Sequence, residues 1–431
     1  MASTLNAAAR RHLRRNFSLG LANGAFFNLS ASLLDPSLVL TWLASQLTSS
    51  NFLIGLVMPI NQGGWFLPQL MVSGYLQGRE RKLPLYVAMS VPRALCWASM
   101  ALALFLINDQ TVLLIFFYTL LTIYSLADGM AGLPFMDIVA KAIPPTRRGA
   151  FFGWRRFLGG ILALGGSLVV KYVLDERWGP AFPHNFGILF LLASLIISVA
   201  MICFGLFMEP VEPVLNQSVD LLGQMKRALH LPRRDANYAR FLAVRFLATA
   251  AGMATPFYIV YAKRVLGVSA GMVGVYLTWA TLAGIASTLI WGQISDRRGN
   301  RGVILLTSLV GLSMPLAALF IPLLVGRQPP RVAWVPFAFT VVFVLSGVFQ
   351  MGRMIGYSNY LLDIAPASDR PLYIGLANTL TGLTMLASAV GGLIVDLAGL
   401  AVLFWVAAAF YAGALLLSGK LRESREIVVD Q

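Results

Sequence analysis

Long runs of apolar residues are the feature that most constrains how this 431-residue chain folds. A helix that crosses the hydrocarbon core of a bilayer needs about 20 mostly apolar residues. Because backbone groups in lipid must find partners within their own segment, each run is expected to be a helix. The twelve segments that qualify are 17–43, 52–76, 84–107, 111–140, 150–173, 184–208, 238–262, 270–295, 302–326, 333–363, 371–396 and 400–419.

The composition excludes the other broad classes of protein. Hydrophobic residues make up 58% of the chain and charged residues 12%, against roughly a quarter charged in a soluble domain. Two cysteines exclude a disulfide scaffold, and three histidines, all in polar connecting stretches, leave little material for a metal site. We find no set of nucleophile, base and orienting residue. The sequence therefore predicts an all-α membrane protein that is not an enzyme and has no cofactor or metal.

The distribution of basic residues predicts the orientation of the chain in the membrane. With an even number of spans, both termini lie on one side, and 24 of the 33 lysines and arginines fall on that side. The opposite loops hold six, and three lie inside spans. The positive-inside rule then places both termini in the cytoplasm of a multi-pass protein of the plasma (inner) membrane. The net charge of +15 indicates contact with membrane lipids and no binding of nucleic acid.

The two halves of the chain form a repeat with an offset of about 220 residues. Asp35-Pro36 in the first span aligns with Thr255-Pro256 in the seventh. We therefore predict three parts: an N-terminal six-helix bundle over 1–208, a cytoplasmic linker over 209–237 and a C-terminal six-helix bundle with a short tail over 238–431. Leucines and basic residues from Leu221 onward indicate that the linker holds an amphipathic helix on the membrane surface.

A loop motif after the eighth span carries a family resemblance. The stretch from Gly292 to Arg301 resembles the glycine, acid and arginine pattern of the major facilitator superfamily, whereas the first-half copy has Gly78 where the acid is expected. The resemblance implies a twelve-helix secondary transporter that alternates access to a central site, and it indicates no subfamily. It also implies that the motif closes the cytoplasmic side as a gate. The gate residues are Gly292, Asp296, Arg297, Gly299 and Arg301.

Polar residues inside the spans are the candidate binding residues for substrate and protons. An ionisable group at membrane depth is costly and normally faces a partner or a wet cavity. Most candidates lie in spans 1, 4, 7 and 10, which line the cavity in the resembled superfamily, and one lies in span 11. The candidates are Asn28, Asp35, Tyr124, Asp128, Arg245, Gln350, Arg353 and Asn378.

Each charged candidate also has a purely structural interpretation. Asp35 could carry a proton or only bond the backbone groups that Pro36 leaves free. Asp128, Arg245 and Arg353 could bind an anionic group or form an ion pair within the protein, and Arg245 could extend to the cytoplasmic interface. Arg93 in span 3 is more simply explained as a structural partner of an acid such as Asp128.

The sequence leaves three functional hypotheses open. If the protein is a transporter, we expect it to be a proton-coupled monomer that carries a small molecule. The first, slightly preferred because of the aromatic-rich chain and the acid in span 1, is export of an amphiphilic compound. The second is transport of a small organic anion or polar metabolite, which the arginines of spans 7 and 10 favour. The third is a non-transporting membrane receptor or scaffold on the same fold.

Overall fold

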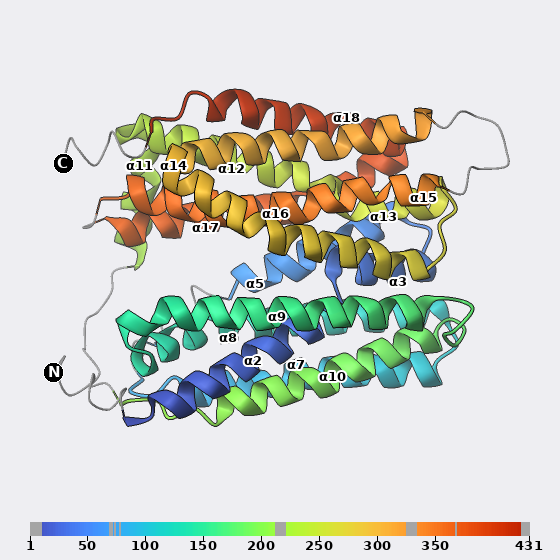
Figure 1. Ribbon diagram of the computed structural model, residues 1–431, viewed down its shortest axis with the longest axis horizontal. Coiled ribbons are helices and arrows are strands. Elements are labelled where there is room, and N and C mark those ends of the chain that lie inside the picture. The colour runs from blue at the N-terminus through green and yellow to red at the C-terminus, as the bar shows by residue number, and fades with distance from the viewer. Residues whose placement is uncertain are drawn as a thin grey trace. The chain divides into compact units, whose positions relative to one another are not determined.

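A computed structural model describes residues 11–68, 72, 75–76, 79–211, 221–324, 334–366 and 369–423. All regular secondary structure in these ranges is helical (Figure 1). Nine helical segments among the described residues are long and apolar enough to cross a membrane. The predicted all-α membrane class is therefore confirmed, while the count of twelve spans stays a prediction.

The chain divides into two compact units whose boundaries differ from those of the sequence repeat. The first unit comprises Met1–Thr48 and Ile60–Ser218, and the second comprises Ser49–Pro59 and Val219–Gln431. A short piece of the predicted second span thus belongs with the C-terminal part of the chain. The predicted boundaries at 208 and 238 are not tested by this division and stay predictions.

Five long helices form the body of the first unit, and they bury aromatic side chains. Helix α10 contacts both α2 and α7, while α2 also contacts α9, and α7 contacts α8. Phe186, Phe190 and Phe204 of α10 are at most 1% exposed at these contacts. The helices of the first unit are α2 (Leu13–Leu33), α3 (Thr41–Leu47), α5 (Gly64–Phe66), α7 (Leu83–Leu106), α8 (Gln110–Ala142), α9 (Pro145–Leu174) and α10 (His184–Gly205).

The second unit is built around α14, which contacts both α16 and α18. Its core is rich in tyrosine, and Tyr238, Tyr276, Tyr360 and Tyr411 are nearly fully buried. The helices of this unit are α4 (Asn51–Met58), α11 (Leu221–Arg234), α12 (Ala236–Ala251), α13 (Thr255–Arg264), α14 (Gly271–Leu324), α15 (Val335–Ala338), α16 (Thr340–Ile364), α17 (Arg370–Ala387) and α18 (Val390–Ser418).

The aligned prolines interrupt the first helix of each predicted half. Proline has no N–H to donate, so a helix that contains it loses a backbone hydrogen bond. In the first unit α2 ends before Asp35, and a π-helical turn over Pro36–Leu40 leads into α3. In the second unit a 3₁₀ turn over Gly252–Ala254 separates α12 from α13, which begins at Thr255-Pro256. The interruption is thus common to both copies of the repeat.

Two glycines with positive φ separate helices that would otherwise be too long. Helix α14 has 54 residues, which at about 1.5 Å each is more than twice the thickness of a bilayer core of about 30 Å. Gly299 breaks it with φ 75°, and Gly399 breaks α18 with φ 86°. These breaks fall between the predicted spans 8 and 9 and between spans 11 and 12.

A helix is present in the predicted linker. Helix α11 contacts α12 and α17, beside which it lies in Figure 1. Ala228 and Leu231 are buried, whereas Leu229 of the predicted apolar face is 60% exposed. The basic residues Arg227 and Arg233 are also exposed.

Large apolar side chains cover much of the remaining surface. Leu106, Leu289, Leu397 and Leu416 are each more than 70% exposed. Exposed apolar area on this scale would be a liability in water, but lipid chains can cover it. The surface thus agrees with an integral membrane protein.

Replacing either break glycine by alanine should destabilise the protein. Left-handed backbone costs a non-glycine residue roughly 1–2 kcal/mol. The new Cβ adds little to this cost at either position, because Gly399 has open space around it and the group nearest to Gly299 is the flexible carboxylate end of Glu423. Gly299→Ala and Gly399→Ala should therefore both lower the thermal midpoint, by similar amounts. The control is Gly252→Ala, where φ is −60° and no atom lies within 4 Å. Equal midpoints for all three variants would contradict the argument.

Candidate functional site

A buried ion pair joins two helices of the first unit. Nη2 of Arg93 on α7 lies 2.5 Å from Oδ1 of Asp128 on α8. The Arg93 side chain is 3% exposed and the Asp128 side chain 23%. The guanidinium also lies 5.6 Å from the ring of Phe27 and donates to the sulfur of Met201. The structural pairing expected for Arg93 is therefore present, and it neutralises Asp128.

The other candidates of the first unit have local partners. Tyr124 stacks on Trp97 with 4.1 Å between the ring centroids, one turn from Asp128. Asn28 donates to the carbonyl of Gly24 at 2.7 Å and lies against Gly159 of α9, where a Cβ would collide with its amide. Among the described residues, no hydrogen bond or ion pair joins Asn28 to Arg93 or Asp128.

Asp35 caps the π-helical turn that follows it. Its Oδ1 accepts hydrogen bonds from the backbone N–H groups of Ser37 and Leu38 at 3.0 and 2.9 Å, and from the Ser37 hydroxyl at 2.6 Å. These are the donors that an acid before a proline can satisfy at a helix N-terminus. One oxygen of the carboxylate is thus engaged by three donors within three residues of it.

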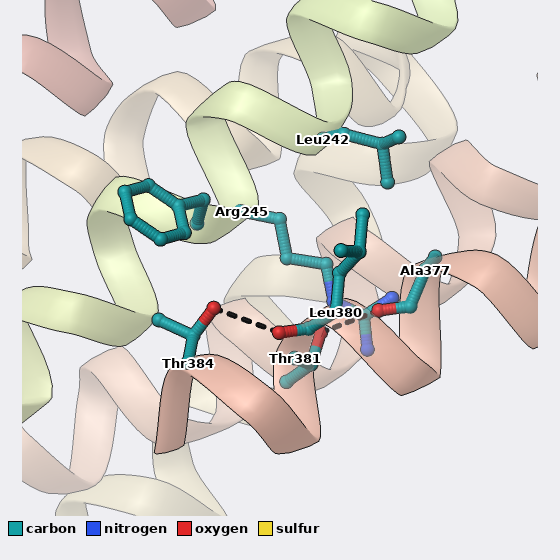
Figure 2. Close-up of a pocket in the computed structure, with 7 residues that line it drawn as sticks. Leu242, Arg245, Ala377, Leu380, Thr381 and Thr384 are labelled. Atoms are coloured by element: carbon teal, nitrogen blue, oxygen red, sulfur yellow. Dashed lines mark hydrogen bonds between the residues drawn. The ribbon is translucent and has the colours of Figure 1, made fainter. Parts of the chain in front are cut away.

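In the second unit Arg245 crosses from α12 to α17. Its Nη2 donates to Oδ1 of Asn378 at 3.0 Å. Figure 2 shows the side chain extending towards Ala377 and Thr381 of α17. The pocket at this place has a volume of about 10 Å³, which is room for about one water molecule. Its lining residues are Leu242, Arg245, Phe246, Ala377, Leu380, Thr381 and Thr384.

Arg353 lies on α16 with Gln350. Its Nη2 donates to Oε1 of Gln350 at 3.2 Å. The charge of Arg353 acts unfavourably on Arg245, so the two guanidinium groups lie within electrostatic reach of each other. The structure therefore brings together four of the eight candidates, Arg245, Asn378, Gln350 and Arg353, within one unit.

The charged candidates of the first unit and those of the second unit differ in whether an opposite charge lies close to them. Among the residues that the structure describes, neither Arg245 nor Arg353 forms an ion pair with a carboxylate. Their hydrogen-bond partners are the neutral amides of Asn378 and Gln350, which accept hydrogen bonds without neutralising the positive charge. A partly buried cation without a counter-charge is costly, so such a group is a candidate for binding an anion.

The predicted gate residues cluster at the break in α14. Asp296 lies in the helix before the break, and Gly299 has its Cα beside Glu423 of the C-terminal segment. Arg301 donates to the carbonyl of Gly419 at 2.7 Å, and Asn300 donates to Asp363 at 2.7 Å. Their role as a gate stays a prediction. Gly74 and Gly78 of the first-half copy lie outside the described residues.

Sequence reasoning missed an acid at the start of α7. The carboxylate of Glu209 accepts from the backbone N–H groups of Lys82 and Leu83 at 2.8 Å and lies 3.8 Å from the ammonium of Lys141. An acid at a helix N-terminus satisfies free amides and complements the helix dipole. Glu209 lies in the segment predicted to be a linker. The one feature of the sequence that singled it out was its position directly before Pro210.

Sequence reasoning also missed Arg155 of α9. Because α9 begins at Pro145, Arg155 lies well inside the helix, although the five basic residues of 141–156 were counted with the cytoplasmic side. Its Nη1 donates to Oδ1 of Asn23 at 2.7 Å and to the carbonyl of Gly20 at 3.1 Å, and the guanidinium lies 4.6 Å from the ring of Phe135. Like Arg245, it forms no ion pair among the described residues.

A double-mutant cycle should reveal the coupling between Arg93 and Asp128. Arg93→Met leaves the carboxylate buried without its cation and should cost about 3 kcal/mol, seen as a lower thermal midpoint in detergent. Arg93→Met combined with Asp128→Leu removes both charges and should recover part of this loss. Strictly additive effects of the two single changes would show that the pair contributes no stability.

Comparisons with known proteins show what parts of the chain resemble. Residues 240–428 match the sequence model of the Major Facilitator Superfamily. An uncharacterized protein of Mycobacterium tuberculosis is 23% identical over 274 residues, and one of Mycobacterium bovis matches equally. Each match covers 62% of this chain, and the chain spans about half the length of these curated relatives.

Solved structures share the fold over almost the whole chain. A D-xylose-proton symporter has a TM-score of 0.70 at 15% identity and covers 96% of this chain and 99% of its own. A POT family transporter in complex with 5-aminolevulinic acid has a TM-score of 0.70 at 13% identity, covering 95% and 97%. A bacterial homologue of the iron transporter ferroportin has a TM-score of 0.68 at 14% identity, covering 95% and 99%. Residues 240–428 therefore resemble the Major Facilitator Superfamily, and almost the whole chain shares the fold of these solved transporters.

Proposed function

We propose that the protein is a secondary transporter of a small organic anion that works by alternating access. The observation that carries the proposal is the pair of arginines without counter-charges, Arg245 and Arg353, held by the amides of Asn378 and Gln350. A carboxylate or phosphate oxygen would complete these guanidinium groups with charge-assisted hydrogen bonds. The organic-anion hypothesis thus has more support than export of an amphiphilic compound.

The acids of the first unit support the same choice. A lipophilic cation would need an acid available to it, yet Asp35 accepts three hydrogen bonds nearby and Asp128 is paired with Arg93. Arg155 adds a further cation without an acidic partner among the described residues of the first unit. The described interior therefore offers more uncompensated positive than negative charge.

Proton coupling is a finer proposal that rests on Asp128. Protonation of its carboxylate would remove the negative charge that attracts Arg93. A proton and the guanidinium of Arg93 therefore compete for the carboxylate of Asp128. The D-xylose-proton symporter that shares the fold is named as a proton-coupled protein, which makes such coupling compatible with the architecture. The direction of transport, the monomeric state and the cytoplasmic termini stay predictions.

Binding of anions to the purified protein should depend on Arg353 and Arg245. A ligand that binds the folded protein raises its thermal midpoint, by a few degrees near a hundredfold excess over Kd. We expect citrate, succinate or phosphate to do this, and Arg353→Gln and Arg245→Gln to weaken the effect about tenfold or more. The matched control is Arg240→Gln, an exposed arginine on the same helix as Arg245.

Export of an amphiphilic compound predicts a different pattern of ligand binding. Stabilisation by tetraphenylphosphonium that is lost in Asp128→Asn, together with no response to any anion, would overturn the anion proposal. It would favour the amphiphile exporter instead. An equal loss of anion binding in Arg240→Gln would show that the effect reflects net charge only.

A pH gradient across proteoliposomes should drive transport only while Asp128 can ionise. Asp128→Asn cannot take up or release a proton at this position, so gradient-driven uptake of the bound anion should fall at least about tenfold. Exchange of labelled for unlabelled anion without a gradient should persist. Asp35→Asn should retain coupling if the cap is its main role. Gradient-driven transport that survives in both variants would contradict proton coupling through these acids.

A further inference from the structure

Tyr357 of α16 carries a buried hydroxyl that lacks a hydrogen-bond partner among the described residues. The side chain is 5% exposed, and the hydroxyl itself is buried. Ser308 of α14 lies near the phenol, but its own hydroxyl donates to the carbonyl of Ile304 at 2.9 Å, and no hydrogen bond joins the two side chains. A buried donor without a partner costs free energy, and folded proteins rarely contain one. The hydroxyl therefore needs an explanation in terms of function.

The phenol lies beside the two arginines of the candidate site. Tyr357 follows Arg353 by about one helical turn, so both side chains leave the same face of α16. Its ring lies 6.0 Å from the ring of Phe241 on α12, and Phe241 precedes Arg245 by about one turn. The phenolic oxygen is within electrostatic reach of both guanidinium groups. Helices α12 and α16 thus bring two cations and one hydroxyl together.

Neither arginine can accept the proton of the phenol. A guanidinium group carries only donors, so it can donate to the phenolic oxygen but cannot accept from the hydroxyl. The side-chain oxygens of Gln350 and Asn378 each accept from one of the arginines. An anion would supply what the three groups lack, which is an acceptor for the hydroxyl and negative charge for the cations.

The charge of the two arginines indicates what kind of anion fits them. Arg245 and Arg353 contribute two positive charges, and no carboxylate among the described residues forms an ion pair with either. A carboxylate brings one negative charge on two oxygens. A phosphate monoester brings nearly two negative charges at neutral pH, and it carries three terminal oxygens on one atom. Such a group can compensate both guanidinium groups and also accept from the phenol.

We propose that Tyr357 binds the transported anion together with Arg245 and Arg353, and that the bound group is a doubly charged oxyanion, as in a phosphate monoester. The proposal rests on the proposed transport of a small organic anion and narrows its chemical class. The guanidinium groups provide the charge. The phenol donates a directed hydrogen bond without adding charge, so it distinguishes anions by the position of their oxygens.

Ligand binding to the purified full-length protein in detergent tests the charge of the anion. The probes are methyl phosphate and methyl sulfate, which have the same shape, and Kd is obtained from the shift of the thermal midpoint with ligand concentration. At about pH 8 methyl phosphate carries two charges and methyl sulfate one, so methyl phosphate should bind about tenfold more tightly or better. At about pH 5, below the second phosphate pKa of about 6, this difference should largely disappear. Methyl sulfate keeps one charge throughout and reports any effect of pH on the protein.

Tyr357→Phe tests the hydroxyl, because it keeps the ring. It should weaken the binding of doubly charged methyl phosphate about tenfold. The thermal midpoint of the ligand-free protein should stay the same or rise, since a buried donor without a partner is removed. The matched control is Tyr360→Phe on the same helix, where the hydroxyl donates to the carbonyl of Arg422 at 2.8 Å. This control should lower the ligand-free midpoint and leave Kd unchanged.

The outcomes separate this inference from the proposed function. Equal affinity of Tyr357→Phe and the unchanged protein for methyl phosphate overturns the role of Tyr357. Equal affinity of methyl phosphate and methyl sulfate at the higher pH overturns the doubly charged class, as does binding of succinate without binding of methyl phosphate. If Arg353→Gln weakens anion binding in these cases, the proposed anion transport still stands. If no anion binds at either pH, the proposed function fails together with this inference.

Discussion

The need of every backbone polar group for a partner within lipid shapes this structure throughout. A regular helix meets the need internally, and each departure from regular helix has to meet it by other means. Where Pro36 interrupts the first span, Asp35 accepts from two backbone amides. Where α7 begins, Glu209 does the same from a distant part of the sequence. The acids of this protein are few, and several serve the ends of helices.

The acids and the arginines differ in the kind of partner that each one has. Asp35, Asp128, Glu209 and Asp396 each have cationic or backbone partners close by. Arg245 and Arg353 have amides instead, and these leave the positive charge in place. A chain with so few charges at membrane depth is expected to compensate those it keeps. The exceptions are therefore the positions at which a ligand has most to contribute.

The sequence predicted the helical class and an acid partner such as Asp128 for Arg93. It did not predict the interruptions near Pro36 and Pro256, because both fall inside segments expected to be continuous spans. It predicted less well where partners come from distant segments. Arg155 was counted with the cytoplasmic side although it lies inside the predicted span 150–173. Glu209 and Asp396 cap helices far from them in sequence, and periodicity within one segment carries no information on such contacts.

The placement of residues 49–59 also bears on how the repeat relates to the folded units. The sequence repeats by halves, but the second compact unit includes eleven residues of the first half, 49–59. A polypeptide that begins after the linker would lack α4, and the backbone of Gly392 would lose the neighbours Asn51 and Phe52. The repeat in the sequence and the compact units of the fold therefore have different boundaries. The C-terminal half takes part of its packing from a segment of the first half.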